Sequence, residues 1–389
     1  MKEVLVITNY FPPETGAASN RIYHLAEGLQ KRNYKVQVVT PLPNYPTGKI
    51  FNDYKGKFKR TSFENQIEIH RLWIYASNSK NKVLRLVAML SYSLSLVWFF
   101  AFKKIPKTVI IQSPPLLVAF TSVLFLRSKK RKLILNVSDL WPLAGLELGA
   151  FKKGMSYSVL ERMERFNYKH ANLVLGQSEE ILTHVRGHFP NKPTFLYRNF
   201  PHIERPDLSA YRSPENKIHV VYAGLLGVAQ GVYKLCRHLD YSRIHFHIYG
   251  DGAERQQIES FLQNASHDSI TYHGSVSREE LHSEILTYDI AIIPLLNRIY
   301  GSVPSKIFEF SKLGMPLLYF GGGEGETIIR DYNLGWVANV GDYGDLNNVI
   351  EQIDGRSIDL NFRKGVLERA QKAFQLDSQL DTLAKTIDT

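Results

Sequence analysis

Residues 4–40 read VLVITNYFPPETGAASNRIYHLAEGLQKRNYKVQVVT, and this stretch sets the architecture of the chain. Val4–Thr8 and Val36–Thr40 are short apolar runs of the kind that form buried strands. Between them, Ala18–Arg32 repeats apolar residues at helical spacing. A strand, a helix and a second strand of this kind predict a βαβ unit, whose parallel sheet is covered by helices.

The same alternation continues along the chain. In the first half, the further expected strands are Thr108–Gln112, Leu133–Val137 and Leu173–Gly176. In the second half, they are Ile218–Ala223, Ile244–Tyr249, Ile270–Tyr272, Ile290–Pro294 and Pro316–Tyr319. Helices are expected over Ala253–Gln263, Arg278–Tyr288 and Ser305–Leu313. The pattern predicts an α/β protein with two Rossmann-like, doubly wound parallel-sheet domains that face each other across a cleft.

The length of 389 residues is too great for a single core. We expect a first domain over residues 1–198 and a second over residues 217–370. Residues 199–216, rich in proline and charge, are the expected linker. Residues 371–389 are expected to form a helix that crosses back to the first domain.

The charge is distributed unevenly between the two halves. Residues 1–200 hold 30 Lys and Arg against 12 Asp and Glu, whereas the remainder holds 18 against 25. The excess predicts an anionic partner for the first domain, such as nucleic acid, a lipid surface or a phosphorylated substrate. A basic surface kept for solubility is the alternative.

Few residues suit a metal or a disulfide. The single cysteine, Cys236, excludes an internal disulfide framework and a Cys-based zinc site. No Asp-rich metal motif is evident either, so we expect no metal and no other cofactor.

Leu86–Phe102 is a run of 17 residues without a charge. As a helix it would be roughly 25 Å long, just short of a bilayer core. The expected strands before and after it belong to one sheet, so we expect the helix to lie in a membrane interface without crossing it. Tyr92 and Trp98 would then lie at the level of the lipid headgroups. A helix buried under its own sheet is the alternative.

Basic residues accompany this run. Leu116–Leu126 is also apolar and leads into the basic cluster of residues 127–132. An apolar helix beside basic residues predicts docking to an anionic lipid surface. The residues expected at the membrane are Leu86, Tyr92, Trp98, Phe102, Lys103, Lys104, Arg127, Lys129, Lys130 and Arg131. No nucleic-acid-binding module is present, so we expect no nucleic-acid partner.

Two loops suit a phosphate group. The loop FPPETGAASN at residues 11–20 opens directly into a helix, and Gly16 permits close approach to its N-terminal N–H groups. An ordinary strand-to-helix turn explains this loop equally well. Gly250-Asp251-Gly252 and GGGEGE at residues 321–326 follow strands and are expected to accept a ligand, although the second can also be a mobile loop.

The segment VPSKIFEF at residues 303–310 is a stronger signal. Ser305 is expected to cap a helix whose first turn contains Lys306, where the helix dipole disfavours a cation. A bound diphosphate would offset that cost, and Glu309 could accept hydrogen bonds from sugar hydroxyls. A surface helix with a Lys–Glu pair is the alternative.

The order and spacing of these segments resemble the retaining glycosyltransferases of the GT-B fold, of the family 4 type. The branch most similar builds O-antigen, capsule and colanic-acid-type polysaccharides on lipid carriers. The matching segments include FPPETGAASNR (11–21), QSPPLL (112–117), NVSDLWP (136–142), YAGLLGVAQGV (222–232), GDGAERQQIE (250–259) and VPSKIFEFSKLGMPLLY (303–319).

The resemblance implies retaining transfer of a hexosyl or N-acetylhexosaminyl group from a nucleotide-sugar, in particular a UDP-sugar, to a polyprenyl-diphosphate-linked saccharide. The enzyme would be peripheral, on the cytoplasmic side of a bacterial inner membrane, because its first residues do not resemble a signal peptide. Two alternatives are a nucleotide-sugar 2-epimerase and a catalytically inactive, membrane-docked scaffold.

The resemblance also implies roles for single residues. Lys306 would bind the donor diphosphate, Glu309 would hold the ribose, and Gly16 and Ala17 would border the phosphates. Asp139 would contact the sugar or the acceptor, with an ordinary helix cap as the alternative. The remaining positions implied beside the donor are Gly227, Gly250, Gly252 and Val276.

The chain departs from the family pattern at three positions. Many members have an Arg and a Lys where this chain has Leu225 and Gln230, and a Glu where it has Gly301. Arg198 or Arg298 is expected to supply the missing positive charge; otherwise the enzyme would be slow or inactive.

Overall fold

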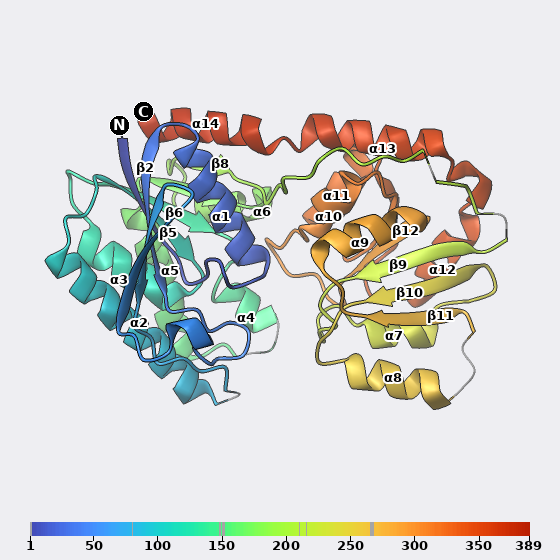
Figure 1. Cartoon of the computed structure of the whole chain (residues 1–389), viewed down its shortest axis with the longest axis horizontal. Coiled ribbons are helices and arrows are strands. Elements are labelled where there is room, and N and C mark those ends of the chain that lie inside the picture. Colours follow the sequence, from blue (N-terminus) through green and yellow to red (C-terminus); the bar gives the residue numbers. More distant parts are fainter. Residues whose placement is uncertain are drawn as a thin grey trace. The chain divides into compact units, whose positions relative to one another are not determined.

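Two α/β units divide the chain, each built on a predominantly parallel sheet (Figure 1). The computed structural model describes residues 2–79, 81–147, 149, 152–209, 211–214, 216–264 and 268–389. The first unit comprises Met1–Asn199 together with Leu376–Thr389, and the second comprises Phe200–Gln375. The prediction of an α/β protein with two doubly wound sheets is confirmed.

The first sheet has the strand order β3-β4-β2-β1-β5-β6-β7-β8. Its strands are β1 Lys2–Ile7, β2 Tyr34–Pro41, β3 Lys59–Glu64, β4 Ile67–Leu72, β5 Thr108–Ser113, β6 Lys132–Val137, β7 Leu173–Gly176 and β8 Thr194–Leu196. Neighbouring strands run parallel except β3 and β4, which pair antiparallel at one edge.

The helices of this unit lie in two layers. They are α1 Ala17–Gln30, α2 Lys82–Phe102, α3 Leu116–Leu126, α4 Leu143–Glu147, α5 Met155–His170, α6 Glu179–His188 and α14 Leu376–Asp388, with a 3-10 turn η1 at Asn52–Tyr54. The chain moves in opposite directions along the sheet through α1 and through α3, so right-handed crossovers place these two helices on opposite faces. α2, α3 and α5 pack side by side, whereas α1 packs against α14.

The last helix is part of the first unit although it ends the chain. On α14, Asp381 lies 2.7 Å from Arg32 Nε of the α1 region, and Asp388 accepts a hydrogen bond of 2.5 Å from Tyr34. Leu380 and its apolar neighbours on α14 are buried. These contacts bind the end of the chain to α1 and β2.

The second sheet is entirely parallel, in the order β11-β10-β9-β12-β13-β14. Its strands are β9 Ile218–Ala223, β10 Ile244–Tyr249, β11 Ile270–Gly274, β12 Ile290–Pro294, β13 Leu317–Phe320 and β14 Gly335–Val337. Its helices are α7 Val232–His238, α8 Arg255–Asn264, α9 Arg278–Glu284, α10 Lys306–Ser311, α11 Glu324–Asp331, α12 Tyr343–Gln352 and α13 Leu360–Ala373, with 3-10 turns η2 Ile285–Thr287 and η3 Gly355–Ser357.

Part of the expected linker belongs to the core of this second unit. Two positions of residues 199–216 lie outside the described residues, and the others form no helix or strand. Tyr211 is nevertheless buried, and its hydroxyl donates to Asp289 and to the Ile358 carbonyl. The guanidinium of Arg363 lies 4.1 Å from the centre of the Tyr211 ring. This segment is therefore fixed by packing and is not a free tether.

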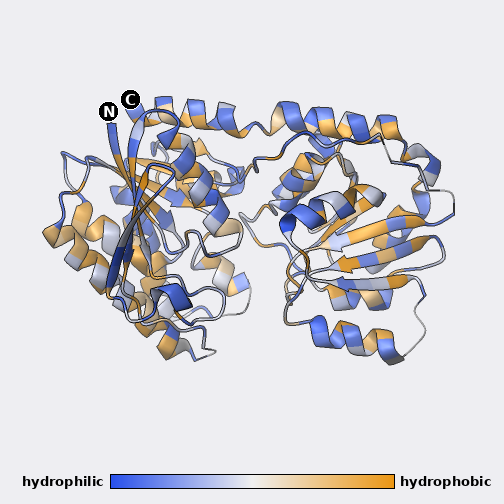
Figure 2. Cartoon of the chain, viewed as in Figure 1, coloured by the Kyte–Doolittle hydropathy of each residue, from blue (hydrophilic) through white to orange (hydrophobic). Residues whose placement is uncertain are grey.

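The α2 helix is apolar along most of its length (Figure 2). Among the described helices, only Val83–Phe102 is long and apolar enough to cross a membrane, with a mean hydropathy of 1.8, and 33% of it is buried. Length and composition alone do not separate a membrane helix from a core helix. The side chains show that α2 is neither fully buried nor fully exposed. One face packs along β4, where the Ser95 hydroxyl donates to the Trp73 carbonyl just after that strand. The other face is exposed.

Two expectations about the membrane-facing residues are wrong. Tyr92 is completely buried: its side chain lies beneath the helix, where its hydroxyl donates to the carbonyls of Thr8 and Val39. Leu116–Leu126 forms α3 as expected, but most of its side chains are buried because α3 packs between α2 and α5. Of its large apolar side chains, Leu124 and Phe125 are the exposed ones.

The basic cluster of residues 127–132 is partly bound to the fold and partly exposed. The guanidinium of Arg131 donates to the Leu126 carbonyl at the end of α3, and that of Arg127 lies over the Phe166 ring. Arg127, Lys129 and Lys130 are exposed, whereas Arg131 is half-buried. Arg131 therefore stabilises the fold, and the three exposed cations remain for a partner.

Candidate functional site

The loops at the carboxyl edge of the second sheet are held together by their backbones. The β9 loop and the β10 loop exchange hydrogen bonds, from Leu226 N to the Asp251 carbonyl and from Glu254 N to the Leu226 carbonyl. Gly250 has a φ of 137°, and a Cβ there would collide with the Gly224 carbonyl oxygen. At Gly252 a Cβ would lie 2.5 Å from the Leu226 carbonyl oxygen, which is also too close. Only glycine fits these two positions, which explains the Gly-Asp-Gly sequence.

A cluster of charged side chains lies between α9 and α10. Arg278 and His282 are four residues apart on α9 and therefore project from the same side of that helix. Both meet Glu309 of α10: Arg278 Nε and His282 Nε2 each lie 2.9 Å from Glu309 Oε1. Lys306 Nζ lies 2.9 Å from the other carboxylate oxygen, Oε2. We call these four residues the Glu309 cluster.

The Glu309 cluster is electrostatically poised for an anion. Burial by itself would raise the pKa of Glu309, but the hydrogen bond from His282 and the charges of Lys306 and Arg278 lower it well below its ordinary value. Glu309 is therefore ionised at neutral pH. The side chains of Arg278 and Lys306, both basic, contact this one carboxylate, so the cluster has a net positive charge.

The structure corrects the expected start of α10. Ser305 makes no capping hydrogen bond with its side chain, and its backbone is helical. The anion that offsets Lys306 in the first turn is Glu309, and the Lys306 ammonium also lies 4.7 Å from the centre of the Phe310 ring. The Lys–Glu pair named as the alternative is thus present. It does not exclude a bound anion, because Glu309 keeps two other partners when Lys306 moves.

The glycine-rich loop after β13 is short and ordered by a helix. Gly321–Gly323 forms a turn, and α11 begins at Glu324, so Gly325 is helical. The side chain of Arg298 packs on this turn, since a Cβ on Gly323 would lie 3.2 Å from Arg298 Nε. A Cβ on Gly325 would lie 3.1 Å from Ile307 Cδ1 of α10. The structure thus brings Arg298, the glycine turn and α10 to one edge of the sheet.

The positions that depart from the family pattern lie in the same loops. Leu225 is exposed beside Gly227 in the β9 loop, Gln230 is half-buried, and Gly301 is buried. Val276, after β11, is half-buried just before α9. Arg278 is a cationic residue of this site that the sequence analysis did not predict. The sequence signal for it was the SREELHSE segment, in which Arg278 and His282 share a helix face.

In the first unit, the loop after β1 is fixed by a buried carboxylate. Glu14 accepts hydrogen bonds from the backbone N–H groups of Asn44 and Tyr45, each 2.8 Å long. Burial raises the pKa of Glu14, against these backbone hydrogen bonds. Gly16 then precedes α1 with a φ of 140°, and Ala17 is the first residue of the helix. The N–H groups of this first turn point out of the helix end, as a phosphate site requires.

Asp139 follows β6 at the carboxyl edge of the first sheet. Burial raises its pKa to about 6, while the charge of Arg21 and the Ser138 hydroxyl act in the opposite direction. Arg21 is buried and donates to Asn136, at 2.8 Å, and to the Tyr197 carbonyl. Two other guanidinium nitrogens of Arg21, Nε and Nη1, have no hydrogen-bond partner. The charge of a buried guanidinium thus acts on a carboxyl group whose pKa is about 6.

Arg198 does not belong to the second unit. It lies in the first, where its backbone pairs with the Gln379 amide of α14 and its guanidinium donates to the Gln177 carbonyl at 3.4 Å. Among the described residues, no group of three or more His, Cys, Asp and Glu side chains has an arrangement that could hold a metal ion.

Comparisons with known proteins agree with this architecture. The family model described as a glycosyl transferase 4-like domain matches residues 16–196, and the model of glycosyl transferases group 1 matches residues 217–353. The putative colanic acid biosynthesis glycosyl transferase WcaI of Escherichia coli strain K12 is 24% identical over 337 residues, which cover 81% of this chain and 82% of WcaI.

Solved structures share the fold at low identity. Sucrose-phosphate synthase from Thermosynechococcus elongatus has a TM-score of 0.76 and 14% identity, over 99% of this chain and 98% of its own. Anabaena HepE in complex with UDP and glucose has a TM-score of 0.65 and 13% identity, over 100% of both chains. The two family models together span most of both units, and the fold is that of these enzymes. The chain therefore belongs to the GT-B glycosyltransferases of the family 4 type.

Proposed function

We propose that this glycosyltransferase moves a sugar, with retention, from a UDP-sugar to a polyprenyl-diphosphate-linked saccharide during the synthesis of a bacterial surface polysaccharide. The similarity to WcaI, a putative colanic acid biosynthesis enzyme, supports a polysaccharide product. HepE binds UDP and glucose in its solved structure, which supports a UDP-sugar donor here. A hexosyl or N-acetylhexosaminyl group is the sugar we propose.

The Glu309 cluster is the observation that carries the proposal. Its net positive charge lies at the carboxyl edge of a doubly wound sheet, where such folds bind nucleotides. In the proposed complex, the Lys306 ammonium turns from Glu309 to the donor diphosphate. Arg278 and His282 keep the Glu309 carboxylate in place, so that it can accept hydrogen bonds from the ribose.

In the proposed reaction, the bond between the sugar's anomeric carbon and the diphosphate oxygen breaks, and a bond to the acceptor oxygen forms on the same face. The acceptor hydroxyl gives its proton to the leaving diphosphate. Lys306 stabilises the charge that develops on that diphosphate, and it does so from a position already set by α10. Asp139 is proposed to accept a hydrogen bond from the acceptor.

We further propose that the first unit docks to the cytoplasmic surface of an anionic membrane as a peripheral protein. The exposed apolar side chains of α2 form a stripe at helical spacing, which we call the α2 stripe: Val83, Leu86, Val87, Leu90, Leu94, Trp98 and Phe102. Exposed lysines lie at the ends of α2 and α3, namely Lys103, Lys104, Lys129 and Lys130. An apolar stripe flanked by lysines suits an interface of acyl chains and phosphates.

The direct test is a nucleotide screen followed by a transfer assay. UDP should raise the thermal unfolding midpoint more than GDP or ADP does, because a ligand that binds the folded state stabilises it. UDP-sugars that bind are then incubated with lipid-linked saccharides, and the sugar is followed into the lipid fraction. Stabilisation by no nucleotide would support an inactive scaffold, and conversion of the UDP-sugar without an acceptor would support an epimerase.

Membrane docking has its own test. The protein should sediment with liposomes that contain phosphatidylglycerol at low salt, and less so at high salt. Lys129→Glu with Lys130→Glu should weaken this sedimentation, whereas the same pair of changes at Lys372 and Lys385, on helices α13 and α14, should not. Equal sedimentation with neutral liposomes would contradict a role for the lysines.

A further inference from the structure

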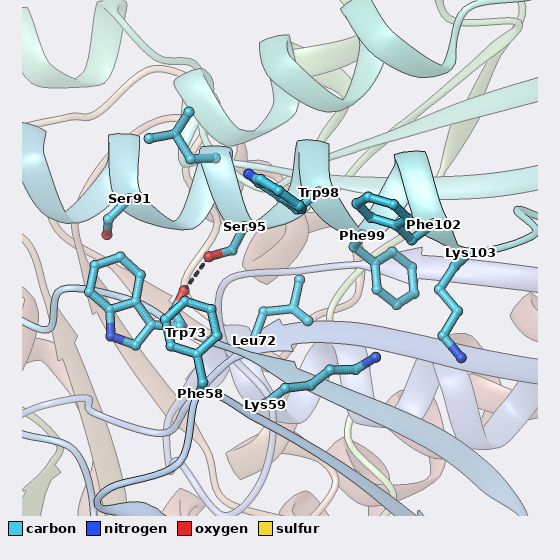
Figure 3. Close-up of a pocket in the computed structure, with 11 residues that line it drawn as sticks. Phe58, Lys59, Leu72, Trp73, Ser91, Ser95, Trp98, Phe99, Phe102 and Lys103 are labelled. Carbon is cyan, nitrogen blue, oxygen red and sulfur yellow. Dashed lines mark hydrogen bonds between the residues drawn. The ribbon is translucent and has the colours of Figure 1, made fainter.

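A cavity of about 530 Å³ opens between α2 and the open end of the β3–β4 hairpin, where β3 begins and β4 ends (Figure 3). It lies within the first unit and is separate from every residue assigned above to the sugar donor or the acceptor sugar. Its volume falls within the range of about 300–1,000 Å³ that is typical of small-molecule sites. Its walls are Phe58, Lys59, Leu72, Trp73, Ser91, Leu94, Ser95, Trp98, Phe99, Phe102 and Lys103.

Two pairs of stacked aromatic rings form much of the wall. Phe58 stacks on Trp73, with ring centres 5.7 Å apart and planes inclined by 9°. Trp98 stacks on Phe102 on the α2 side, with ring centres 5.3 Å apart. Phe58, Trp98 and Phe102 are all largely exposed, so the part of each ring that does not face its stacking partner is left uncovered by the described residues. Such a surface is stabilised by an apolar ligand.

The hydroxyl groups in the wall are already used. The Ser95 hydroxyl donates to the Trp73 carbonyl at 2.8 Å, as drawn in Figure 3. The Ser91 hydroxyl donates to the Ala88 carbonyl at 2.7 Å and accepts from Tyr75 N at 2.9 Å. The interior therefore offers little to a polar ligand and suits a hydrocarbon.

Two cations mark one end of the cavity. Lys59 and Lys103 reach the same side in Figure 3, with Phe99 between them. The Lys59 ammonium lies 5.9 Å from the centre of the Phe99 ring, and Lys103 is exposed. Both lie next to the apolar wall, so a ligand that satisfies the whole cavity has a hydrocarbon chain and an anionic head.

We propose that this cavity binds the first isoprene units of a polyprenyl diphosphate, with the chain between the two stacked aromatic pairs and the diphosphate on Lys59 and Lys103. The inference rests on the proposed lipid-linked acceptor and adds to it a binding site for the lipid. Two lysines at one end match the charge of a diphosphate better than that of a single phosphodiester. The α2 stripe continues past the cavity, which gives the rest of the chain a path into the bilayer.

Binding of the isoprenoid in the cavity can be distinguished from insertion of α2 into a membrane, because binding in the cavity saturates and needs no bilayer. The probe is farnesyl diphosphate, titrated below its micelle concentration into the full chain. Trp73 and Trp98 line the cavity and report binding through their fluorescence. We expect saturation at one ligand per chain. Farnesol, inorganic diphosphate and dihexanoylphosphatidylglycerol should each bind at least about tenfold more weakly, since each lacks one of the matched features.

Matched variants separate the cavity from the membrane surface. Leu94 lines the cavity and is 63% exposed, so Leu94→Asp should fold normally and weaken farnesyl diphosphate binding by about tenfold or more. Leu86, 46% exposed on the same helix but outside the cavity, is the control: Leu86→Asp should leave that affinity unchanged. Likewise Lys103→Glu should weaken binding, and the adjacent Lys104→Glu should not.

Three results would overturn the inference: binding that does not saturate, farnesol or the phosphatidylglycerol binding as tightly as farnesyl diphosphate, or Leu94→Asp behaving like Leu86→Asp. The wild-type titration decides the question even if a variant fails to fold. The assay contains no nucleotide, so its outcome is separate from that of the donor screen. Stabilisation by UDP without farnesyl diphosphate binding would leave the transferase proposal intact and remove the cavity from it.

Discussion

The Lys306 ammonium and the Glu309 carboxylate lie 2.9 Å apart within one turn of α10. Two groups from α9 hold the same carboxylate, at its other oxygen. The pair is therefore asymmetric. When Lys306 moves away, the buried Glu309 carboxylate still has Arg278 and His282 as partners, and these two residues hold Glu309 in place. An anion that competes for Lys306 finds a cation already positioned, next to a carboxylate that stays in place.

This asymmetry predicts the effect of Lys306→Ala. The variant should fold with nearly unchanged stability, because Glu309 retains Arg278 and His282. UDP should bind it about tenfold more weakly or worse, since a hydrogen bond to a charged group contributes about 1.5–3 kcal/mol. Calorimetric titration with UDP measures the change. Lys364→Ala, an exposed lysine on α13, is the control, and equal UDP affinity in the two variants would remove Lys306 from the donor site.

Glu309→Gln should act on stability and on its pH dependence. The folded state holds the pKa of Glu309 below the ordinary value of 4.5, so its carboxylate stabilises the fold above pH 4.5. That stabilisation is lost as the pH falls from 4.5 towards the lower folded-state pKa. We expect the variant to lose about 1.5–3 kcal/mol at pH 7 and to show a flatter decline in acid.

Urea unfolding of the two proteins at pH 7 and pH 3.5 checks this prediction. The control is Glu326→Gln on α11, whose exposed pair with Arg330 should contribute little. A loss for Glu309→Gln no larger than that for Glu326→Gln would show that the cluster does not stabilise the fold.

The sequence predicted the central strands well, apart from β4, and the edges of the sheets poorly, apart from β11. Continuous apolar runs mark strands that are buried on both faces, and the predicted Ile218–Ala223 and Ile244–Tyr249 coincide with β9 and β10. The edge strand β3 is mostly exposed and carries Lys59 and Arg60, so its residues resembled a basic loop. The edge strand β14 has only three residues, too few for a periodic signal.

The functional residues show the same division. Lys306 and Glu309 are three residues apart, so their meeting on α10 could be predicted from the sequence. Arg278 reaches Glu309 across 31 positions, and only the packing of α9 beside α10 brings them together. Likewise, the uncharged run of α2 does not say which face is buried. Tyr92 lies on the buried face and Trp98, 66% exposed, on the other.

The burial of Tyr92 gives a prediction that separates fold from membrane. Tyr92→Phe removes the hydroxyl that donates to the Thr8 and Val39 carbonyls, at a cost of about 1 kcal/mol. Its thermal midpoint should fall, and its sedimentation with anionic liposomes should not change. Trp98→Ser should leave the thermal midpoint nearly unchanged and weaken sedimentation with anionic liposomes, because the Trp98 side chain is exposed. A liposome defect in Tyr92→Phe at unchanged stability would contradict the placement of Tyr92 in the core.

The raised pKa of Asp139 leads us to expect that the transfer reaction slows in acid. Burial raises its pKa to about 6, so its carboxylate is the main form above that pH. If the carboxylate accepts the hydrogen bond of the acceptor, kcat/KM should fall tenfold per pH unit below about 6. Asp139→Asn should be slower at pH 7.5 and should lose this limb. Measured from pH 5 to 8, an unchanged limb in Asp139→Asn would assign the titration to another group.

A row of histidines crosses β9, β10 and β11, and we expect it to make the second unit sensitive to acid. His247 lies between His219 and His273, with ring nitrogens 3.0 Å and 3.1 Å apart, and stacks on His245 at 4.5 Å. Burial, together with the neighbouring imidazoles, lowers the pKa of His247 to about 3. Burial lowers the pKa values of His245 and His273 too. Lys217 also opposes protonation of His245, whereas Glu284 favours that of His273.

A lowered folded-state pKa means that the unfolded chain binds the proton first. Stability is therefore full above the unfolded value of 6.5 and declines as the pH falls from 6.5 towards 3. Between pH 7 and pH 5, His247 should account for roughly 1–2 kcal/mol of that decline. His247→Gln should reduce the fall in the thermal midpoint over this interval, and His202→Gln, an exposed control, should not. The same fall in all three proteins would mean that the histidine row does not set the acid sensitivity.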